Sequence, residues 1–205
     1  MNNLSNLVEI VERLKSQEIR ETINSRMTEF ENVPRNFDDL FRELVFCILA
    51  AGTSAELGIK TINHLGDVIF TGSEKDIQKK LKEVYRFHTI RAEYIHQARE
   101  NFRNLDINAQ DIRINLVENI KGIGFKEASH FLRHIGYNNL AIIDFHIVDL
   151  LVKNNLIEAP KSRSITQKKY IEIENLLDEI AQKTNLCLGE LDLYLWYEET
   201  GKILK

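Results

Sequence analysis

Two residues that could carry out chemistry lie eighteen positions apart, each at the start of an expected helix. Lys126 follows a turn containing Gly122 and Gly124 and falls in the first turn of a helix expected over about 125–135. The positive end of the helix dipole lies there, and the dipole and burial both disfavour the ammonium form. A neutral lysine amine is a nucleophile. The alternative is a surface lysine that extends its charged end into solvent.

Asp144 is the second of these residues. It precedes the apolar run FHIVDLLV and is a good N-cap for a helix expected over about 145–153. A capping carboxylate can leave one oxygen free, which could accept a proton from Lys126 or stabilise positive charge that grows on a sugar ring. An amine beside a carboxylate therefore suits attack on the C1′ atom of a nucleotide. The alternative is that Asp144 is only a cap.

The turn before Lys126 is a candidate phosphate site. One helix is expected to end near Ile120 and the next to begin near Phe125, so Lys121 to Gly124 form the connection. Gly122 and Gly124 can adopt positive φ without a Cβ clash, and such a turn points several backbone N–H groups outward at a helix N-terminus. These groups can bind a phosphate oxygen, as a helix-hairpin-helix element does on a DNA backbone. A plain helical hairpin is the alternative.

Helical spacing dominates the rest of the chain, so the sequence predicts an all-α protein of roughly ten helices. Apolar residues recur at intervals of three and four along residues 4–14, and residues 38–51 become almost wholly apolar, as expected of a central buried helix. Ser73 and Asp76 have the spacing of a capping box. The helices are expected over about 4–14, 18–31, 38–51, 54–64, 74–84, 89–103, 109–119, 125–135, 145–153, 166–182 and 189–198.

Composition narrows the class of protein. Hydrophobic residues make up 43% of the chain and charged residues 28%, as in ordinary globular proteins. No run of about 18 apolar residues is present, and the charged N-terminal segment lacks the apolar centre of a signal peptide, so an intracellular protein is expected. Cys47 and Cys187 are too few for a disulfide framework or a four-cysteine cluster, and each lies in an apolar run. His130 and His134 lie one helical turn apart, but no third ligand is evident, so no metal site is expected.

The net charge of −4 neither indicates nor excludes a nucleic-acid partner, because a local patch is what binds phosphates. Residues 75–103 hold eight lysines and arginines against four acids, a local excess of four positive charges. This segment is either a binding patch or a solvated helix face.

Several motifs resemble a known family. GIGFKEASHFLRHIGY at 122–137, followed by IIDFHI at 142–147, resembles the helix-hairpin-helix DNA glycosylases that carry a catalytic lysine and aspartate. RFHTIRAEYI at 86–95, FCILAAGTSAELG at 46–58 and ELDLYLWYEETGKILK at 190–205 look like the archaeal-type 8-oxoguanine DNA glycosylase/AP lyases. The resemblance covers nearly the whole chain. It implies one glycosylase unit over 1–205, made of two helical lobes with the active-site cleft between them, and a helix-hairpin-helix over about 110–136.

The resemblance also implies the roles of residues. Lys126 matches the family's nucleophile, which forms a Schiff base with deoxyribose, and Asp144 matches its invariant aspartate. The hairpin glycines Gly122 and Gly124 would hold a phosphate near the lesion. The implied reaction is excision of 8-oxoguanine followed by β-elimination, with no metal or organic cofactor. The implied partner is double-stranded DNA containing 8-oxoguanine, with no membrane, for a monomer in a prokaryotic cytoplasm.

Three more residues are candidates for the base pocket. A flipped purine needs stacking surfaces, and in related enzymes the aromatics matching Trp196 and Phe87 contact its two faces. Core packing is the alternative for both. 8-Oxoguanine carries an N7–H donor that guanine lacks, so an acceptor placed there would discriminate strongly. We expect the tail at Lys205, including its α-carboxylate, to supply that acceptor, and a frayed terminus is the alternative.

Two departures from the family pattern are visible. The loop GYNNLAIID lacks the proline of the superfamily's Gly/Pro-rich loop, and Phe145 stands where close relatives often carry a basic residue. The second departure puts one phosphate contact in doubt. Two other functions remain open: a glycosylase/lyase for another oxidised or alkylated base, and a non-catalytic helix-hairpin-helix module that only holds DNA.

Overall fold

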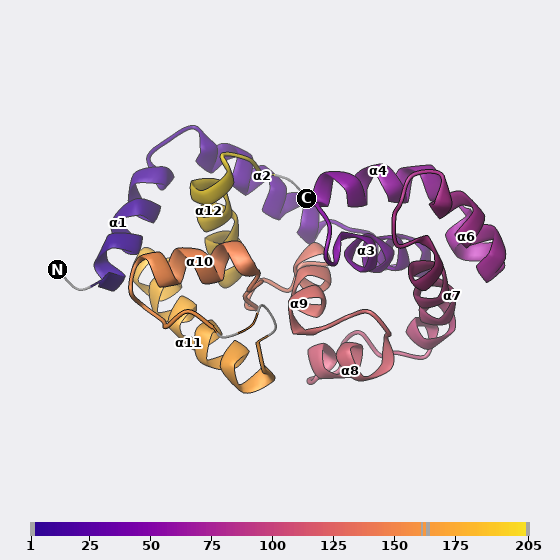
Figure 1. Cartoon of the computed structure of the whole chain (residues 1–205). Coiled ribbons are helices and arrows are strands. Elements are labelled where there is room, and N and C mark those ends of the chain that lie inside the picture. The colour runs from indigo at the N-terminus through magenta and orange to yellow at the C-terminus, as the bar shows by residue number, and fades with distance from the viewer. Residues whose placement is uncertain (1–2, 161, 163–164, 204–205) are drawn as a thin grey trace. The chain divides into compact units, whose positions relative to one another are not determined.

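The computed structural model describes residues 3–160, 162 and 165–203, and these residues fold into helices joined by turns and short extended connections (Figure 1). They contain twelve helices and no strand, which confirms the all-α prediction. The helices are α1 Asn3–Lys15, α2 Ile19–Glu31, α3 Phe37–Ala50, α4 Ala55–Leu65, α5 Val68–Thr71, α6 Glu74–Lys82, α7 His88–Arg103, α8 Ile112–Asn119, α9 Phe125–His134, α10 Phe145–Lys153, α11 Gln167–Thr184 and α12 Leu188–Thr200.

The chain divides into two compact units. The hairpin unit is Val33–Ile135 and carries α3 to α9. The terminal unit combines the described residues of Met1–Asn32 with Gly136–Ile203, and carries α1, α2 and α10 to α12. None of the described helices has both the length and the hydropathy needed to cross a bilayer.

The core of the hairpin unit forms around α3, as the sequence predicted. Residues 43–50 of this helix are all buried, and α3 packs against α4, α7 and α9. The Phe41 ring stacks on Phe37 at 5.3 Å between centroids, while Phe102 of α7 meets Phe131 of α9 edge-on at 5.6 Å. Burial of a phenylalanine side chain stabilises a fold by about 1.5–3 kcal/mol. The contact between Phe102 and Phe131 therefore helps to hold α9 against α7.

A buried polar contact also ties α9 to α3. The Nδ1 atom of His134 lies 2.8 Å from Oε2 of Glu43, and both side chains are buried. The His134 ring stacks on Phe46 at 5.3 Å. A pair of this kind is costly to break from one side, because the remaining polar group stays in the core. The helix that carries Lys126 is therefore anchored at its C-terminal end.

In the terminal unit, α1 packs on α2, α11 and α12, and α12 also contacts α2, α10 and α11. Leu7 and Val11 from α1, and Leu191 and Leu195 from α12, are almost fully buried in this core. The α11 helix ends at Thr184, and the left-handed φ of 53° at its C-cap, Asn185, lets the chain turn sharply toward α12.

Most expected helix boundaries agree with the structure to within a few residues, and the Ser73–Asp76 capping box is present at the start of α6. One expected boundary differs from the structure, and one short helix was not expected. The helix expected from residue 109 begins only at Ile112, because the preceding residues form turns in which the Asp106 side chain accepts the Asn108 N–H at 2.9 Å. The single-turn α5 was not expected, because four residues are too short to show a helical period.

Candidate active site

The turn between α8 and α9 has the predicted boundaries but uses its two glycines differently. Gly122 has φ +83°, a conformation that strongly favours glycine. Gly124 has an extended backbone, with φ −101° and ψ −173°, so the expectation of positive φ applies only to Gly122. The Ile123 N–H already donates to the Ile120 carbonyl at 3.3 Å. Fewer backbone donors are therefore available at this turn than its sequence suggested.

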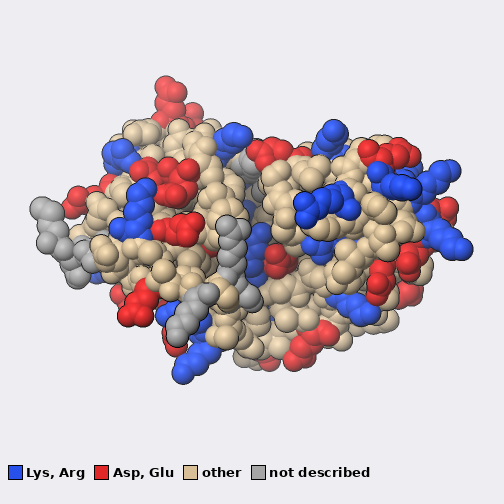
Figure 2. Space-filling model, viewed as in Figure 1, with Lys and Arg blue, Asp and Glu red and all other residues tan. Residues whose placement is uncertain are grey.

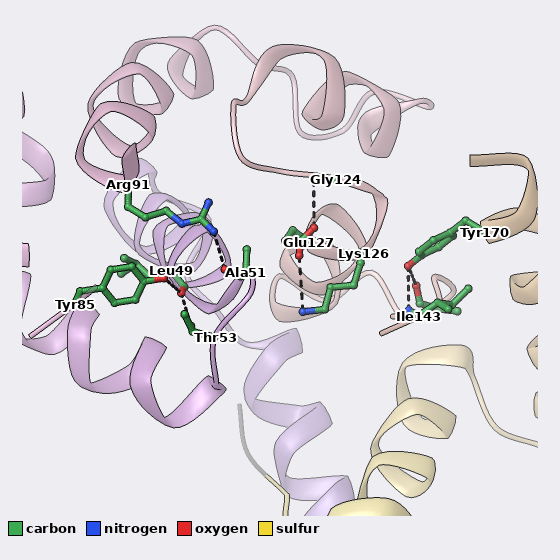
Figure 3. Close-up of polar contacts among 11 residues, drawn as sticks. Leu49, Ala51, Thr53, Tyr85, Arg91, Gly124, Lys126, Glu127, Ile143 and Tyr170 are labelled. Atoms are coloured by element: carbon green, nitrogen blue, oxygen red, sulfur yellow. Dashed lines mark hydrogen bonds and ion pairs between the residues drawn. The ribbon is translucent and has the colours of Figure 1, made fainter. Parts of the chain in front are cut away.

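Gly122 is also required by a close contact with α7. A Cβ atom at this position would lie 2.4 Å from Cδ2 of Tyr94 and 3.2 Å from Nη1 of Arg91. The Arg91 guanidinium in turn donates to the Ala51 carbonyl at 2.6 Å, so it links the hairpin to the end of α3 (Figure 3). Sequence reasoning missed Arg91 and Tyr94 as supports of the hairpin. The signal in the sequence was their spacing of three, which places both side chains on the same face of one helix.

Lys126 is the second residue of α9, in the first turn as predicted, and its side chain is about one-quarter exposed, at 27%. In the described part of its own unit, its charged partner is Glu127, whose Oε1 lies 3.9 Å from Nζ. The other oxygen of Glu127 accepts the Gly124 N–H at 3.3 Å, which is half of a capping box (Figure 3). Glu127 was not predicted, although its position three residues after the N-cap was the signal.

The first turn of α9 also contacts α8. The Arg113 guanidinium of α8 donates to the hydroxyl of buried Ser129 at 3.3 Å and lies 5.1 Å from the centre of the Phe125 ring. The small residue Ser129 of α9 therefore faces α8. Lys126 therefore projects from a backbone whose neighbours are fixed, which is the geometry that a positioned nucleophile needs.

Asp144 lies in the terminal unit, at the N-cap of α10 as predicted. Its Oδ1 accepts the Ile147 N–H at 3.0 Å, and among the described residues its second oxygen has no hydrogen-bond partner. The side chain is only partly buried. The carboxylate can therefore cap the helix with one oxygen and offer the other to a ligand.

The segment before Asp144 is held by side chains of α11. The Tyr170 hydroxyl accepts the Ile143 N–H at 3.1 Å and donates to the Ala141 carbonyl at 2.7 Å (Figure 3). The Glu174 carboxylate accepts the Ala141 N–H at 2.9 Å. These three buried hydrogen bonds fix the backbone that leads into the cap.

The two aromatic candidates lie in different units, and each is partly exposed. Trp196 is on α12, with the His146 ring edge-on at 4.8 Å. Phe87 is at the N-cap of α7, with the Arg86 guanidinium 4.5 Å from the centre of its ring. Partial exposure leaves ring surface available to a ligand. Lys205 lies outside the described residues.

The basic segment 75–103 is not a simple binding patch. Lys80 donates to the Leu65 carbonyl at 3.2 Å, and buried Arg99 donates to the Ile69 and Gly72 carbonyls at 2.8 and 2.9 Å. These cations stabilise the ends of neighbouring helices. Figure 2 shows blue and red side chains interspersed over the part of the hairpin unit that holds α6.

Other reactive groups have ordinary structural roles. Cys47 is buried and Cys187 is partly buried, and both are free thiols. Burial raises the pKa of the Cys187 thiol to about 11, so it is protonated and unreactive near neutral pH. Among the described residues, no group of three or more histidine, cysteine, aspartate or glutamate side chains could hold a metal ion.

An all-α chain with a glycine-containing hairpin, whose second helix carries a lysine in its first turn, has the architecture of the helix-hairpin-helix DNA glycosylases. A family model described as 8-oxoguanine DNA glycosylase matches residues 23–186. The chain belongs to this 8-oxoguanine DNA glycosylase family.

Individual relatives agree over nearly the full length. The 8-oxoguanine DNA glycosylase/AP lyase of Korarchaeum cryptofilum is 48% identical, across 98% of this chain and 99% of that protein. The crystal structure of the Methanocaldococcus jannaschii 8-oxoguanine glycosylase/lyase in complex with a 15mer DNA containing 8-oxoguanine is similar with a TM-score of 0.92, at 44% identity, over 97% of this chain and 99% of that one. The Thermotoga maritima 8-oxoguanine DNA glycosylase has a TM-score of 0.91 at 36% identity, over 98% of this chain and 100% of that one.

Proposed function

We propose that this protein excises 8-oxoguanine from double-stranded DNA and then cleaves the strand at the abasic site, with Lys126 as the nucleophile. The observation that carries the proposal is the lysine in the first turn of α9, in a chain that matches 8-oxoguanine DNA glycosylase/AP lyases along nearly its whole length. A module that only holds DNA has no need of a lysine there.

In the first stage the Lys126 amine attacks C1′ of the extruded nucleotide. The bond from C1′ to the base breaks, its electron pair leaves with the base, and the base gains a proton. Asp144 stabilises the positive charge that develops on the sugar, or accepts the proton that the amine loses, through the oxygen that is not used by the helix cap. The product is an imine between Lys126 and the ring-opened sugar.

In the second stage the imine makes the C2′ proton acidic. Its removal and the departure of the 3′ phosphate oxygen break the strand by β-elimination, and hydrolysis of the imine restores the lysine. Both stages need only protein groups and water, so no cofactor is required. The site of action is DNA within a prokaryotic cell, and the working form is a monomer.

The remaining predicted residues bind the substrate. Gly122 and Gly124 place the turn against a phosphate near the lesion, and Trp196 and Phe87 stack on the extruded base. The tail at Lys205 supplies the acceptor for the N7–H group. Excision by a protein extended beyond Lys205 tests this last role, and an unchanged rate would contradict it.

Borohydride trapping tests the central proposal, because borohydride reduces the imine to a stable covalent adduct. Wild-type protein should form the adduct with duplexes that contain 8-oxoguanine, and Lys126→Gln should form none. Lys121→Gln is the matched control, since it removes a charge from an exposed lysine of the same hairpin. Asp144→Asn should excise the base roughly 10²–10⁴-fold more slowly, the usual contribution of such a group, while it still binds DNA.

The outcomes separate the alternatives. An adduct only with a different damaged base would indicate the runner-up glycosylase. Binding without an adduct on any lesion would indicate the non-catalytic module. An adduct that survives in Lys126→Gln would show that another amine is the nucleophile.

A further inference from the structure

Three aromatic rings of the terminal unit contact one another in a row that begins at Phe145, the residue after Asp144. The Phe145 ring is 4.0 Å from the His146 ring, centroid to centroid, and His146 meets Trp196 edge-on at 4.8 Å. Phe145 is the first residue of α10 and directly follows the capping aspartate. Ring contacts therefore run from the residue that follows the candidate carboxylate to the candidate stacking residue Trp196.

The outermost ring of this row is unusually exposed. Phe145 is 52% exposed, more than the two other exposed large apolar residues among those described, Ile90 and Ile114. The position needs no aromatic for folding, because the first turn of a helix accepts most residues and alanine favours a helix more than phenylalanine does. The helix cap is made by Asp144 and does not use this ring. About half of this side chain is therefore open to solvent next to the capping carboxylate.

We propose that Phe145 is a further DNA-contact residue, whose ring stacks on a base that flanks the extruded nucleotide. The inference rests on the proposed function, because Asp144 must act at the sugar of that nucleotide and Phe145 is its immediate neighbour. Extrusion leaves the flanking bases with an uncovered face, and an aromatic ring covers such a face without regard to sequence. An uncharged ring at this position holds the DNA by stacking, where a lysine or arginine would hold a phosphate.

The consequence is a distinctive salt dependence. A phosphate contact contributes about 0.9 to the slope of log affinity against log salt, whereas stacking contributes nothing to it. Loss of the Phe145 ring should therefore weaken binding equally at low and high salt. A cation at the same position should restore affinity at low salt only.

The experiment measures affinity for a fluorescent duplex that carries a tetrahydrofuran abasic analogue, with 2-aminopurine as the flanking base. Phe145→Ala should bind about tenfold more weakly, within the range for one stacked base, with an unchanged salt slope. Phe145→Tyr should bind as wild type, and Phe145→Lys should steepen the slope by about 0.9. Stacking should quench the 2-aminopurine fluorescence in wild type and not in Phe145→Ala. Ile90→Ala is the control for loss of an exposed apolar side chain.

Affinity and quenching within twofold of wild type in Phe145→Ala would overturn the inference. A parallel loss in Phe145→Tyr would also overturn it, because the ring is retained there. Borohydride trapping of wild type by 8-oxoguanine duplexes keeps the two proposals separate. An adduct together with an inert Phe145 refutes only the stacking contact, whereas absence of any adduct refutes the proposed function.

Discussion

Substitution of Gly122 by alanine should destabilise the protein far more than the same substitution at Gly124. At Gly122 the new side chain meets two penalties. A non-glycine residue in the left-handed region costs about 1–2 kcal/mol. The added Cβ would lie 2.4 Å from Cδ2 and 2.8 Å from Cε2 of the Tyr94 ring, and overpacking of this kind typically costs about 1–3 kcal/mol.

The two penalties together predict a loss of about 2–5 kcal/mol in the free energy of unfolding. For a chain of this size that corresponds to a fall in Tm of roughly 4–20 °C. Gly124 provides the control, because its φ is −101° and its Cβ would meet only a Glu127 carboxylate oxygen at 3.2 Å. That oxygen ends a flexible side chain and can move, so Gly124→Ala should cost less than about 1 kcal/mol.

Thermal unfolding followed by circular dichroism, with urea denaturation in parallel, measures both variants. A double-mutant cycle with Tyr94→Ala then separates the penalties. Without the ring, Gly122→Ala should cost only the backbone penalty of about 1–2 kcal/mol. Equal Tm values for the Gly122 and Gly124 variants would refute the reasoning, and so would additive effects of Gly122→Ala and Tyr94→Ala.

Two further predictions follow from buried groups. Arg99→Met should lower the free energy of unfolding by about 2–4 kcal/mol in urea denaturation, because two helix-end carbonyls lose their donor. Arg103→Met, at an exposed arginine, should change the free energy of unfolding by less than about 0.5 kcal/mol. Similar values for both variants would contradict this prediction. In a Cys47→Ala background, Cys187 should react with iodoacetamide about 100-fold more slowly at pH 8 than an ordinary thiol, since its pKa is about 11 instead of 9.0. The folded pKa is the higher one, so this thiol's contribution to stability is complete below about pH 9 and is lost as pH rises toward about 11. Ordinary reactivity at pH 8, or an alkaline loss of stability unchanged by Cys187→Ala, would contradict the assignment.

The helices and the hairpin could be predicted because their information is local. The apolar period along residues 38–51 identified the buried α3, and the glycine turn gave the end of α8 and the start of α9. A four-residue helix such as α5 carries no period and was missed. Lys126 and Asp144 could be identified as candidates from their positions at helix starts, and the resemblance to a family supplied the roles expected of them.

The partners of these elements could not be predicted, because periodicity shows which face of a helix is buried but not which side chain covers it. Tyr94 and Gly122 are 28 positions apart, and nothing in either segment indicates their contact. The contacts made by the cations of the basic segment could not be predicted for the same reason. Arg99 looks like a surface charge in the sequence, and only the fold shows that it binds two carbonyls in the interior.

The hydrogen bonds that α11 makes to Ala141 and Ile143 take the place of those that a neighbouring strand could make. Tyr170 and Glu174, one helical turn apart, supply these hydrogen bonds from their side chains. A slip of the segment by one residue would move it about 3.3 Å and mismatch all three bonds at once. The position of Asp144 therefore depends on two side chains that lie about thirty residues downstream of it in the sequence.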